Sequence, residues 1–302
     1  MKIVIIGANG FIGWNMMNYF SERHYTTFGC DVSENLHGYR FYTRVQRTGT
    51  DYTPVFEQQD FDLCVNASGS SNVGKSINNP SHDYHLNTQN VFKLLEELRT
   101  TNPRCKFVNF SSAAVYGNPE ALPIGEDARP NPLSPYGWHK YQSEFLCKEF
   151  HQMYGLKTVS LRVFSAYGPG MRNRLFWDIY HKSLAPGPIR LWGTGKESRD
   201  FVFSEDLCRA VEALVHNAPF KGEVVNVSSG HEHTIEEVAT FFVNLLDPDR
   251  EVIFGGEEKP GDPKNWRADV TLLKSYGFEP QVPIFEGLKQ YQEWLIRLTE
   301  PV

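Results

Sequence analysis

The sequence has no excess of basic residues and no long apolar run. The first absence argues against a nucleic-acid partner and the second against a membrane partner. Its 302 residues include 36 acidic and 30 basic side chains, for a formal net charge of −6. Nucleic-acid binding requires clustered Lys and Arg side chains that neutralise phosphates, so we expect no nucleic-acid partner. No apolar run reaches the roughly 18 residues that a membrane helix needs, so we expect no membrane partner.

Cysteine is scarce, and its spacing fits no disulfide framework or zinc site. The five cysteines are far apart and include no C-x-x-C pair, which predicts reduced thiols in a cytoplasmic protein. The apolar run 3–6 is too short for a signal peptide and predicts a buried strand. His231 and His233 have no companion carboxylate or thiol motif, so we interpret them as part of a solvated loop and predict no metal.

A glycine-rich turn between a strand and a helix is the first positive signal. The β-branched run 2–6 predicts a strand buried on both faces of a parallel sheet. After it, glycines permit a tight turn, approach of the backbone to a pyrophosphate, and packing of helix on strand. The N–H groups at the start of the helix would bind the phosphate. The expected cofactor-binding residues here are Gly7, Gly10, Phe11, Ile12 and Gly13.

Asp31 ends a second predicted strand, 26–30, about 20 residues beyond the glycine motif. A carboxylate at this place hydrogen-bonds the adenosine ribose hydroxyls and repels a 2′-phosphate, so the sequence favours NAD over NADP. Residues 35–53 predict no regular element, and the adenine contacts stay unplaced among them.

Further strands and helices alternate along the chain. Strands are predicted at 62–67, 106–110 and 156–163, with a long helix over 80–98 and another that begins at Pro135. This alternation predicts an α/β fold, a Rossmann doubly wound parallel sheet with a smaller, interleaved α/β substrate-binding lobe. Ligands bind such sheets at the carboxyl ends of the strands.

The stretch 134–140 carries the candidate chemistry. Ser134 can cap a helix and Pro135 suits its first turn, which places Tyr136 and Lys140 on one face. An ammonium near a phenol lowers the pKa of the phenol from its usual value of about 10, which makes Tyr136 a candidate acid/base. An ordinary amphipathic helix is the alternative. Ser112 follows the strand 106–110 and is expected to face the same crevice.

Together these motifs resemble the extended short-chain dehydrogenase/reductases of the nucleotide-sugar epimerase/dehydratase family, over nearly the whole chain. The motifs that carry the resemblance are 7–13, Asp31, 80–87, 111–117, Tyr136 with Lys140, 162–170, 199–202, 226–230 and 260–262. The resemblance implies Ser112, Tyr136 and Lys140 as the catalytic triad. It also implies Asn87, Ser111, Tyr136 and Lys140 as cofactor contacts, with Lys140 at the nicotinamide ribose.

The resemblance further implies a nucleotide-diphosphate sugar as substrate. Arg199 and Lys259 stand where the family binds the diphosphate, although Lys259 replaces an arginine. Ser165 replaces an asparagine of many 4-epimerases, and Trp266 stands at a sugar contact. Arg174, among aromatic residues, suits a phosphate beside a stacked base or sugar; a helix with core aromatics is the alternative.

The resemblance also bears on the organisation of the chain. We expect an NAD-binding Rossmann domain over 1–165. The rest, 166–302, is expected to be mainly the nucleotide-sugar-binding lobe, with Rossmann elements returning near 196–250. The segment 164–170 is expected to form a loop near the nicotinamide, and 272–278 and 284–298 are expected to close the smaller lobe. A homodimer through helices in the Val91 and Tyr141 regions is implied by the family.

Ala113 and Ala114 depart from one branch of the family. Members that dehydrate or decarboxylate the sugar carry acid/base side chains there, and alanine has no proton to transfer. This leaves a nucleotide-sugar 4-epimerase, acting by NAD(P)-dependent hydride transfer at hexose C4, as the predicted function. A 4-ketoreductase of an NDP-4-keto-6-deoxyhexose is the alternative, and a non-catalytic NAD-sensing protein on the same fold is a third hypothesis.

Overall fold

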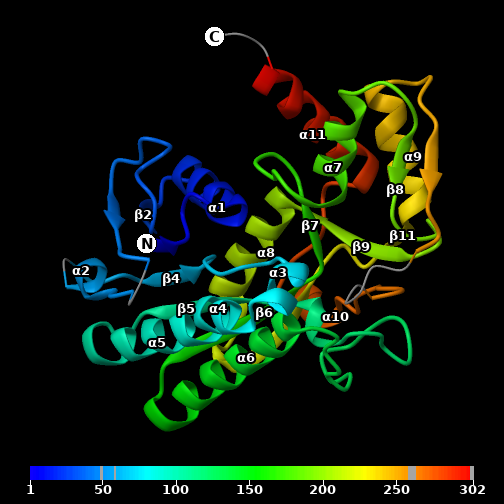
Figure 1. The fold of residues 1–302 in the computed structure, drawn as a ribbon. Helices are drawn as coiled ribbons and strands as arrows, with labels where there is room; N and C mark the ends of the chain where they lie inside the picture. The colour runs from blue at the N-terminus through cyan, green and yellow to red at the C-terminus, as the bar shows by residue number, and fades with distance from the viewer. Residues whose placement is uncertain (48–49, 58, 258–262, 300–302) are drawn as a thin grey trace.

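The computed structural model describes residues 1–47, 50–57, 59–257 and 263–299. Its centre is a seven-stranded sheet in the order β10-β6-β5-β4-β1-β2-β3, in which every neighbouring pair is parallel (Figure 1). The strands are β1 (Lys2–Ile6), β2 (Thr26–Asp31), β3 (Tyr42–Arg44), β4 (Leu63–Asn66), β5 (Lys106–Ser112), β6 (Lys157–Val163) and β10 (Lys221–Val227). This sheet confirms the predicted fold class.

Helices cover both faces of the sheet, which is why its central strands β1 and β4 are almost continuously apolar. In β1, Ile3 and Ile5 pack on the side of α1 (Phe11–Glu22) and α8 (Ser204–Asn217). Val4 and Ile6 point to the opposite side, towards α5 (Asn90–Thr101) and α6 (Pro135–Tyr154). Figure 1 shows these two layers on either side of the strands. The alternation of side chains along a strand thus fills two separate cores.

The second half of the chain builds a smaller lobe, drawn at the upper right of Figure 1. It holds a three-stranded sheet, β11-β9-β7, and a two-stranded sheet, β12-β8. Its core contains Tyr167, Phe176, Phe242 and Tyr291. The elements are β7 (Ser165–Tyr167), α7 (Arg174–Ser183), β8 (Ile189–Leu191), β9 (Ser198–Phe203), β11 (Glu232–Thr234), α9 (Ile235–Leu246), β12 (Val252–Phe254) and α11 (Ile284–Thr299).

The chain returns to the large sheet after it has entered the smaller lobe. α8 packs against α1, and β10 extends the sheet beside β6. The helix α10 (Thr271–Ser275) packs on β10, because Leu273 and Phe278 join the core of the large sheet. Our expectation that 272–278 belongs to the smaller lobe was therefore wrong. The segment 164–170, expected as a loop, contains β7 because it pairs with β9.

The predicted helix over 80–98 is interrupted in the middle. It consists of α4 (Pro80–Tyr84), a π-helical turn η1 (His85–Gln89) and α5. The short helices α2 (Thr53–Phe56) and α3 (Val73–Asn78) and the 3₁₀ turn η2 (Ala113–Val115) complete the elements. π-Helical turns are rare and are frequent at functional sites. None of the described helices is long and apolar enough to cross a membrane.

Candidate active site

The glycine turn after β1 has the geometry that a bound phosphate requires. Gly7 has φ +84°, and its N–H donates to the Cys30 carbonyl of β2 at 2.7 Å; the Gly10 N–H donates to the Gly7 carbonyl at 3.0 Å, which closes the turn. A Cβ on Gly13 would lie 2.0 Å from the Gly7 carbonyl oxygen, so only glycine allows α1 to pack this closely. Gly10 is the N-cap of α1 and supplies no side-chain acceptor. The first N–H groups of the helix, at Phe11, Ile12 and Gly13, therefore suit an anion.

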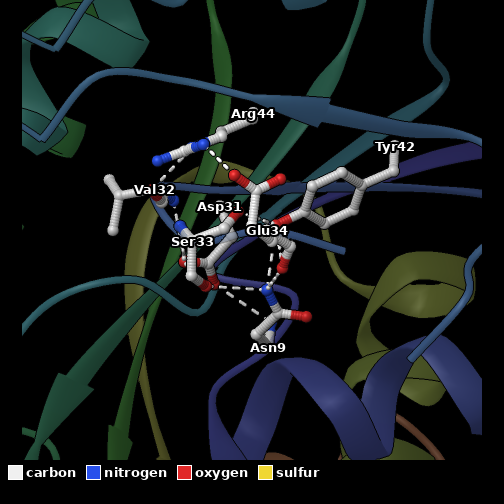
Figure 2. A network of polar contacts seen from close by, with 7 residues as sticks. All are labelled: Asn9, Asp31, Val32, Ser33, Glu34, Tyr42 and Arg44. Carbon is white, nitrogen blue, oxygen red and sulfur yellow. Dashed lines mark hydrogen bonds and ion pairs between the residues drawn. The ribbon is translucent and has the colours of Figure 1, made fainter. Parts of the chain in front are cut away.

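Asp31 holds the loop after β2 against the glycine turn (Figure 2). Its carboxylate accepts the backbone N–H of Asn9 at 3.0 Å, that of Val32 at 2.7 Å and that of Ser33 at 3.2 Å. The Asn9 amide donates to the Ser33 hydroxyl at 2.8 Å, and Tyr42 donates to the Ser33 carbonyl at 2.6 Å. The predicted ribose-binding carboxylate is thus fixed between the glycine motif and the end of β2.

Sequence reasoning missed the residues that support Asp31. Asn9 lies inside the glycine motif, but a polar side chain there gave no signal of its own. Tyr42 and Arg44 lie in the stretch 35–53, for which the sequence predicted no regular element. The structure has strand β3 there, and its Arg44 is in register with Asp31. Arg44 forms an ion pair with Glu34 and donates to the Val32 carbonyl at 3.3 Å.

The three predicted catalytic residues come together at the end of β5 and the start of α6. Ser134 caps α6 as expected, because its hydroxyl accepts the Gly137 N–H at 3.2 Å. The Ser112 hydroxyl lies near enough to the Tyr136 phenol to lower its pKa. Lys140 is buried one turn further along α6, and its ammonium donates to the Phe110 carbonyl at 2.8 Å. Ser112 at the end of β5 thus forms one cluster with Tyr136 and Lys140 of α6.

Burial dominates the titration of this cluster. It raises the pKa of Tyr136, against the hydrogen bond from Ser112 and the positive charge of Arg174, both of which lower it; Asp83 adds to the rise. Burial also lowers the pKa of Lys140 to about 8, against the charge of Asp83. The expectation that Lys140 lowers the pKa of Tyr136 was therefore wrong for this structure: the ammonium is held at the Phe110 carbonyl, and burial of the phenol outweighs the charges around it.

Asn87 lies in the π-helical turn η1, beneath the turn that follows β4. Its Oδ1 accepts the Ser70 N–H at 3.2 Å, while its buried Nδ2 has no hydrogen-bond partner among the described residues. A Cβ on Gly69 would lie 2.5 Å from Asn87 Oδ1 and 3.5 Å from Lys140 Nζ. The backbone thus passes directly over both side chains, and a buried amide donor is left for a ligand.

Ser111 has a structural contact that the sequence did not predict. Its hydroxyl donates to the buried carboxylate of Glu144 at 2.5 Å, and Glu144 pairs with Arg162 at 2.7 Å. The guanidinium of Arg162 lies over the ring of Tyr116, 4.7 Å from its centroid. The hydroxyl of Ser111 is engaged in this core, so the predicted cofactor contact would fall to its backbone.

Arg174 reaches from the smaller lobe to the turn after β4. It is the first residue of α7 and has φ +69°, a left-handed conformation that non-glycine residues rarely adopt. Its guanidinium donates to the Ser71 carbonyl, and its charge acts on Tyr136. Strained backbone of this kind persists where the surrounding structure imposes it, often at ligand sites.

Three of the other predicted substrate contacts lie among the described residues, and the fourth does not. Arg199 and Trp266 lie together, with the guanidinium 5.5 Å from the indole centroid, and the indole N–H donates to the Gly117 carbonyl at 3.0 Å. Ser165 lies half-buried at the start of β7. Lys259 and the neighbouring motif 260–262 lie outside the described residues.

Asp200, in the motif 199–202, has a structural role that the sequence did not predict. It is fully buried, and its carboxylate accepts from the Ser228 hydroxyl at 2.6 Å, the Gly230 N–H at 3.0 Å and the Ala268 N–H at 3.0 Å. These bonds join β9 to the motif 226–230 and to the segment that carries Trp266. Asp200 thereby positions the substrate-side residues without itself being a candidate for catalysis.

Comparisons of the sequence and of the structure both match epimerases or dehydratases of nucleotide sugars. A family model described as "NAD dependent epimerase/dehydratase family" matches residues 3–228. The chain is 26% identical to a putative UDP-glucose 4-epimerase of Methanocaldococcus jannaschii, over 97% of this chain and 98% of that protein. It is 28% identical to a dTDP-glucose 4,6-dehydratase of Xanthomonas campestris, over 82% and 76%. The solved UDP-glucuronic acid 4-epimerase of Bacillus cereus, in complex with UDP-glucuronic acid and NAD, superposes with a TM-score of 0.88 at 24% identity, over 99% and 100%.

Proposed function

The chain belongs to the NAD-dependent epimerase/dehydratase family, and from this premise we propose that it is a nucleotide-sugar 4-epimerase. The single observation that carries the proposal is the cluster of Ser112, Tyr136 and Lys140, in which Ser112 acts on the ionisation of Tyr136 and is followed directly by Ala113 and Ala114. The relatives named above include epimerases and dehydratases. The two alanines select the epimerase, because elimination of water needs a second acid/base group at that place.

The residues at the carboxyl ends of the strands suit NAD. Gly7, Gly10, Phe11, Ile12 and Gly13 would hold the pyrophosphate, and Asp31 the adenosine ribose. Asn87, the Ser111 backbone, Tyr136 and Lys140 would bind the nicotinamide end, where the unpartnered Asn87 amide supplies a donor. NAD, when bound, supplies the hydride acceptor for the C4 hydrogen. Arg44 is paired with Glu34, which favours NAD over NADP because its charge is not offered to a 2′-phosphate.

Tyr136 is the acid/base at the sugar, and Ser112 fixes the geometry. The phenolate of Tyr136 takes the proton of the 4-hydroxyl as the C4 hydride leaves. After the 4-keto sugar has turned over, the same hydride would return to the other face of C4 and Tyr136 returns the proton to the same oxygen. Ser112 donates a hydrogen bond that favours the phenolate and orients the sugar oxygen. The Lys140 ammonium, held at the Phe110 carbonyl, would bind the nicotinamide ribose.

The substrate is a nucleotide-diphosphate sugar. Arg199 and Lys259 would bind the diphosphate, and Trp266 would contact the sugar. Ser165 and Arg174 would also contact the nucleotide sugar. We propose 1–165 as the NAD-binding domain, joined by the returning elements α8 and β10, and 166–302 as mainly the substrate lobe. All five cysteines are free and buried, which suits a reducing compartment, the cytoplasm.

The test is to incubate the purified protein, without added cofactor, with a panel of UDP- and dTDP-hexoses and to resolve the C4 epimers by chromatography. The proposal expects interconversion from both sides of the equilibrium. No interconversion across the panel would contradict it. Stoichiometric consumption of added NADH or NADPH by a 4-keto-6-deoxy sugar nucleotide would instead establish the 4-ketoreductase, which uses the same three residues in one direction.

A further inference from the structure

A buried ion pair lies beside the end of β5, outside the predicted triad. The side chains of Glu144, on α6, and Arg162, on β6, are only 4% and 5% exposed. The guanidinium donates from Nε to Glu144 Oε1 at 2.9 Å and from Nη2 to Oε2 at 2.7 Å, so the pair is bidentate. Glu144 Oε1 also accepts the hydroxyl of Ser111 at 2.5 Å. Because Ser111 and Arg162 are in register on adjacent strands, one carboxylate ties α6 to both β5 and β6.

Glu144 continues the line of candidate catalytic side chains along α6. Tyr136, Lys140 and Glu144 follow one another at intervals of four residues, and all three are buried. Residues that are four apart lie on one face of a helix. The face that carries the acid/base and the lysine therefore also carries this carboxylate.

α6 holds the last residues of β5 through this face. The Lys140 ammonium donates to the Phe110 carbonyl at 2.8 Å. The Glu144 carboxylate binds the next residue, Ser111, and Ser112 follows directly as the last residue of the strand. The helix that carries the acid/base thus fixes the strand end that carries the serine.

Arg162 also contacts the chain that follows Ser112. Its guanidinium lies over the ring of Tyr116, 4.7 Å from the centroid, and its Nη1 donates to the Glu126 carbonyl at 3.1 Å. The Tyr116 hydroxyl donates to Asn226 Oδ1 at 2.6 Å, which ties this ring to β10. The ion pair therefore contacts the residue before Ser112 and a residue four positions after it, on both sides of the turn η2.

A buried ion pair contributes little to stability, so its presence here needs another explanation. The loss of hydration on burial offsets much of the attraction between the charges, and apolar side chains of similar volume often replace such pairs without loss of stability. Apolar side chains could not provide the directional bond to the Ser111 hydroxyl. A bidentate pair also holds the carboxylate in one orientation. Because Ser111 borders Ser112, this orientation is fixed at the place where the candidate chemistry occurs.

We propose that Glu144 and Arg162 are positioning residues for the reaction. Arg162 fixes the carboxylate of Glu144, and Glu144 fixes Ser111. The end of β5 then keeps Ser112 in the position relative to Tyr136 that proton transfer requires. Both side chains of the pair are buried and bonded to each other, so they act through Ser112 and not on the substrate. The inference rests on the proposed function for its kinetic readout, because it assigns the pair a role in that same site.

The test compares Ser111→Ala with Thr158→Val, its matched control. Each variant removes one buried hydrogen bond that joins α6 to the sheet, since the Thr158 hydroxyl donates to the Cys147 carbonyl at 2.7 Å. That bond lies about two turns beyond Lys140, away from Ser112.

We expect kcat of Ser111→Ala to fall about ten- to a hundredfold, because a displacement of about 1 Å at a reacting group can cost that much. The KM for the sugar nucleotide should stay within about threefold, since neither side chain of the ion pair binds it. Thr158→Val should keep kcat within about twofold of wild type, although urea unfolding should show a similar loss of stability in both variants. Wild-type kcat in Ser111→Ala would overturn the inference, as would an equal fall in Thr158→Val.

A double variant separates positioning from stability. Glu144→Leu with Arg162→Met replaces the ion pair with apolar side chains, as buried pairs commonly allow, but it lacks the acceptor for the Ser111 hydroxyl. We expect kcat to fall as in Ser111→Ala while the stability in urea is retained. Wild-type kcat in the double variant would contradict the inference. If the double variant does not fold by circular dichroism, the comparison of Ser111→Ala with Thr158→Val decides the question.

Hydrogen exchange distinguishes failure of this inference from failure of the proposed function. Peptides that cover 112–116 are followed by mass spectrometry. Their amides should exchange about tenfold faster in Ser111→Ala, the effect of one lost buried hydrogen bond, and at the wild-type rate in Thr158→Val, whether or not a sugar nucleotide is converted. Equal exchange in the wild type and Ser111→Ala would refute the positioning role. Faster exchange in Ser111→Ala with no turnover by the wild type would contradict the epimerase alone.

Discussion

The phenol of Tyr136 is acted on by burial, a hydrogen bond and two charges, and burial is the largest. Arg174 and Ser112 favour the phenolate, while burial and Asp83 favour the phenol. A buried group responds strongly to each nearby charge because little water screens it. Burial and the charges around Tyr136 therefore determine the pH at which it can accept a proton.

Tyr136→Phe should abolish epimerisation and spare cofactor binding. It removes the acid/base but keeps the ring, so we expect kcat to fall on the order of 10²- to 10⁴-fold, the usual contribution of a positioned acid/base group. The measurements are turnover with UDP-hexoses and NAD bound per protein after denaturation. Activity within a factor of about two of wild type would refute the assigned role of Tyr136.

Arg174→Gln should raise the pKa of Tyr136, because it removes a charge that lowers it. The phenolate then forms at higher pH, so the acid limb of the kcat profile should move upwards while the alkaline limb stays. Arg172→Gln is the matched control, since Arg172 lies two positions away and its guanidinium stacks on Trp294 at 5.9 Å. Equal profiles for the two variants would argue against an electrostatic role of Arg174.

Glu34→Gln should weaken the preference for NAD. It leaves Arg44 without its carboxylate partner, so the guanidinium can attract a 2′-phosphate at the adenosine ribose. The pair is exposed and screened, so we expect only a two- to fivefold lower Kd for NADP, about the strength of a surface ion pair. Fluorescence titration of both cofactors measures it. The double variant with Arg44→Gln should lose the gain; a gain that persists there would have another cause.

At the scale of elements, Ser134 gives a direct measure of how local sequence builds the site. Its hydroxyl caps α6, and α6 carries Tyr136 and Lys140. Ser134→Ala should cost about 1 kcal/mol of unfolding free energy, the usual value of an N-cap. Ser134→Asp, which keeps an acceptor, should retain most of it. Urea unfolding measures both, and equal stability of the alanine variant would show that the cap contributes nothing here.

The elements that could be predicted are those specified by neighbouring residues. The turn at Gly7, the cap at Ser134 and the apolar strands each follow from a few consecutive residues. The loop that contains β7 and the helix α10 were misassigned, because their partners β9 and β10 are distant in sequence. Likewise, Tyr42 supports Asp31 and Asp83 faces His139 across long sequence separations, and no local pattern contains such a contact.

At the scale of the molecule, the two halves are linked by buried polar side chains. Asp200 joins β9 to the segments at Ser228 and Ala268. Asn226, at the end of β10, accepts the Tyr116 hydroxyl at 2.6 Å and donates to the Ile124 carbonyl at 2.8 Å. Several family motifs that seemed separate along the chain are therefore partners in space. The substrate lobe is built onto the sheet, so its residues are positioned by the same core as the catalytic helix.

The outer faces of α5 and α6 carry an aromatic surface. Phe92, Trp138 and Phe145 are 45%, 49% and 54% exposed, and the rings of Tyr141 and Phe145 lie 4.8 Å apart. Large exposed apolar side chains that gather on one face mark interaction sites. The homodimer that the sequence resemblance implies would bury them, since a twofold axis pairs one such face with its copy.

Phe145→Glu should convert that dimer to a monomer, because it places a charge at the centre of an apolar interface. Light scattering after size-exclusion chromatography would measure the mass, and Glu149→Gln, on the same exposed side of α6, is the control that should stay dimeric. Tyr136 and Lys140 lie on the opposite, buried side of α6, so the monomer should still bind NAD. A monomeric wild-type protein at micromolar concentration would refute the dimer and leave the proposed chemistry untouched.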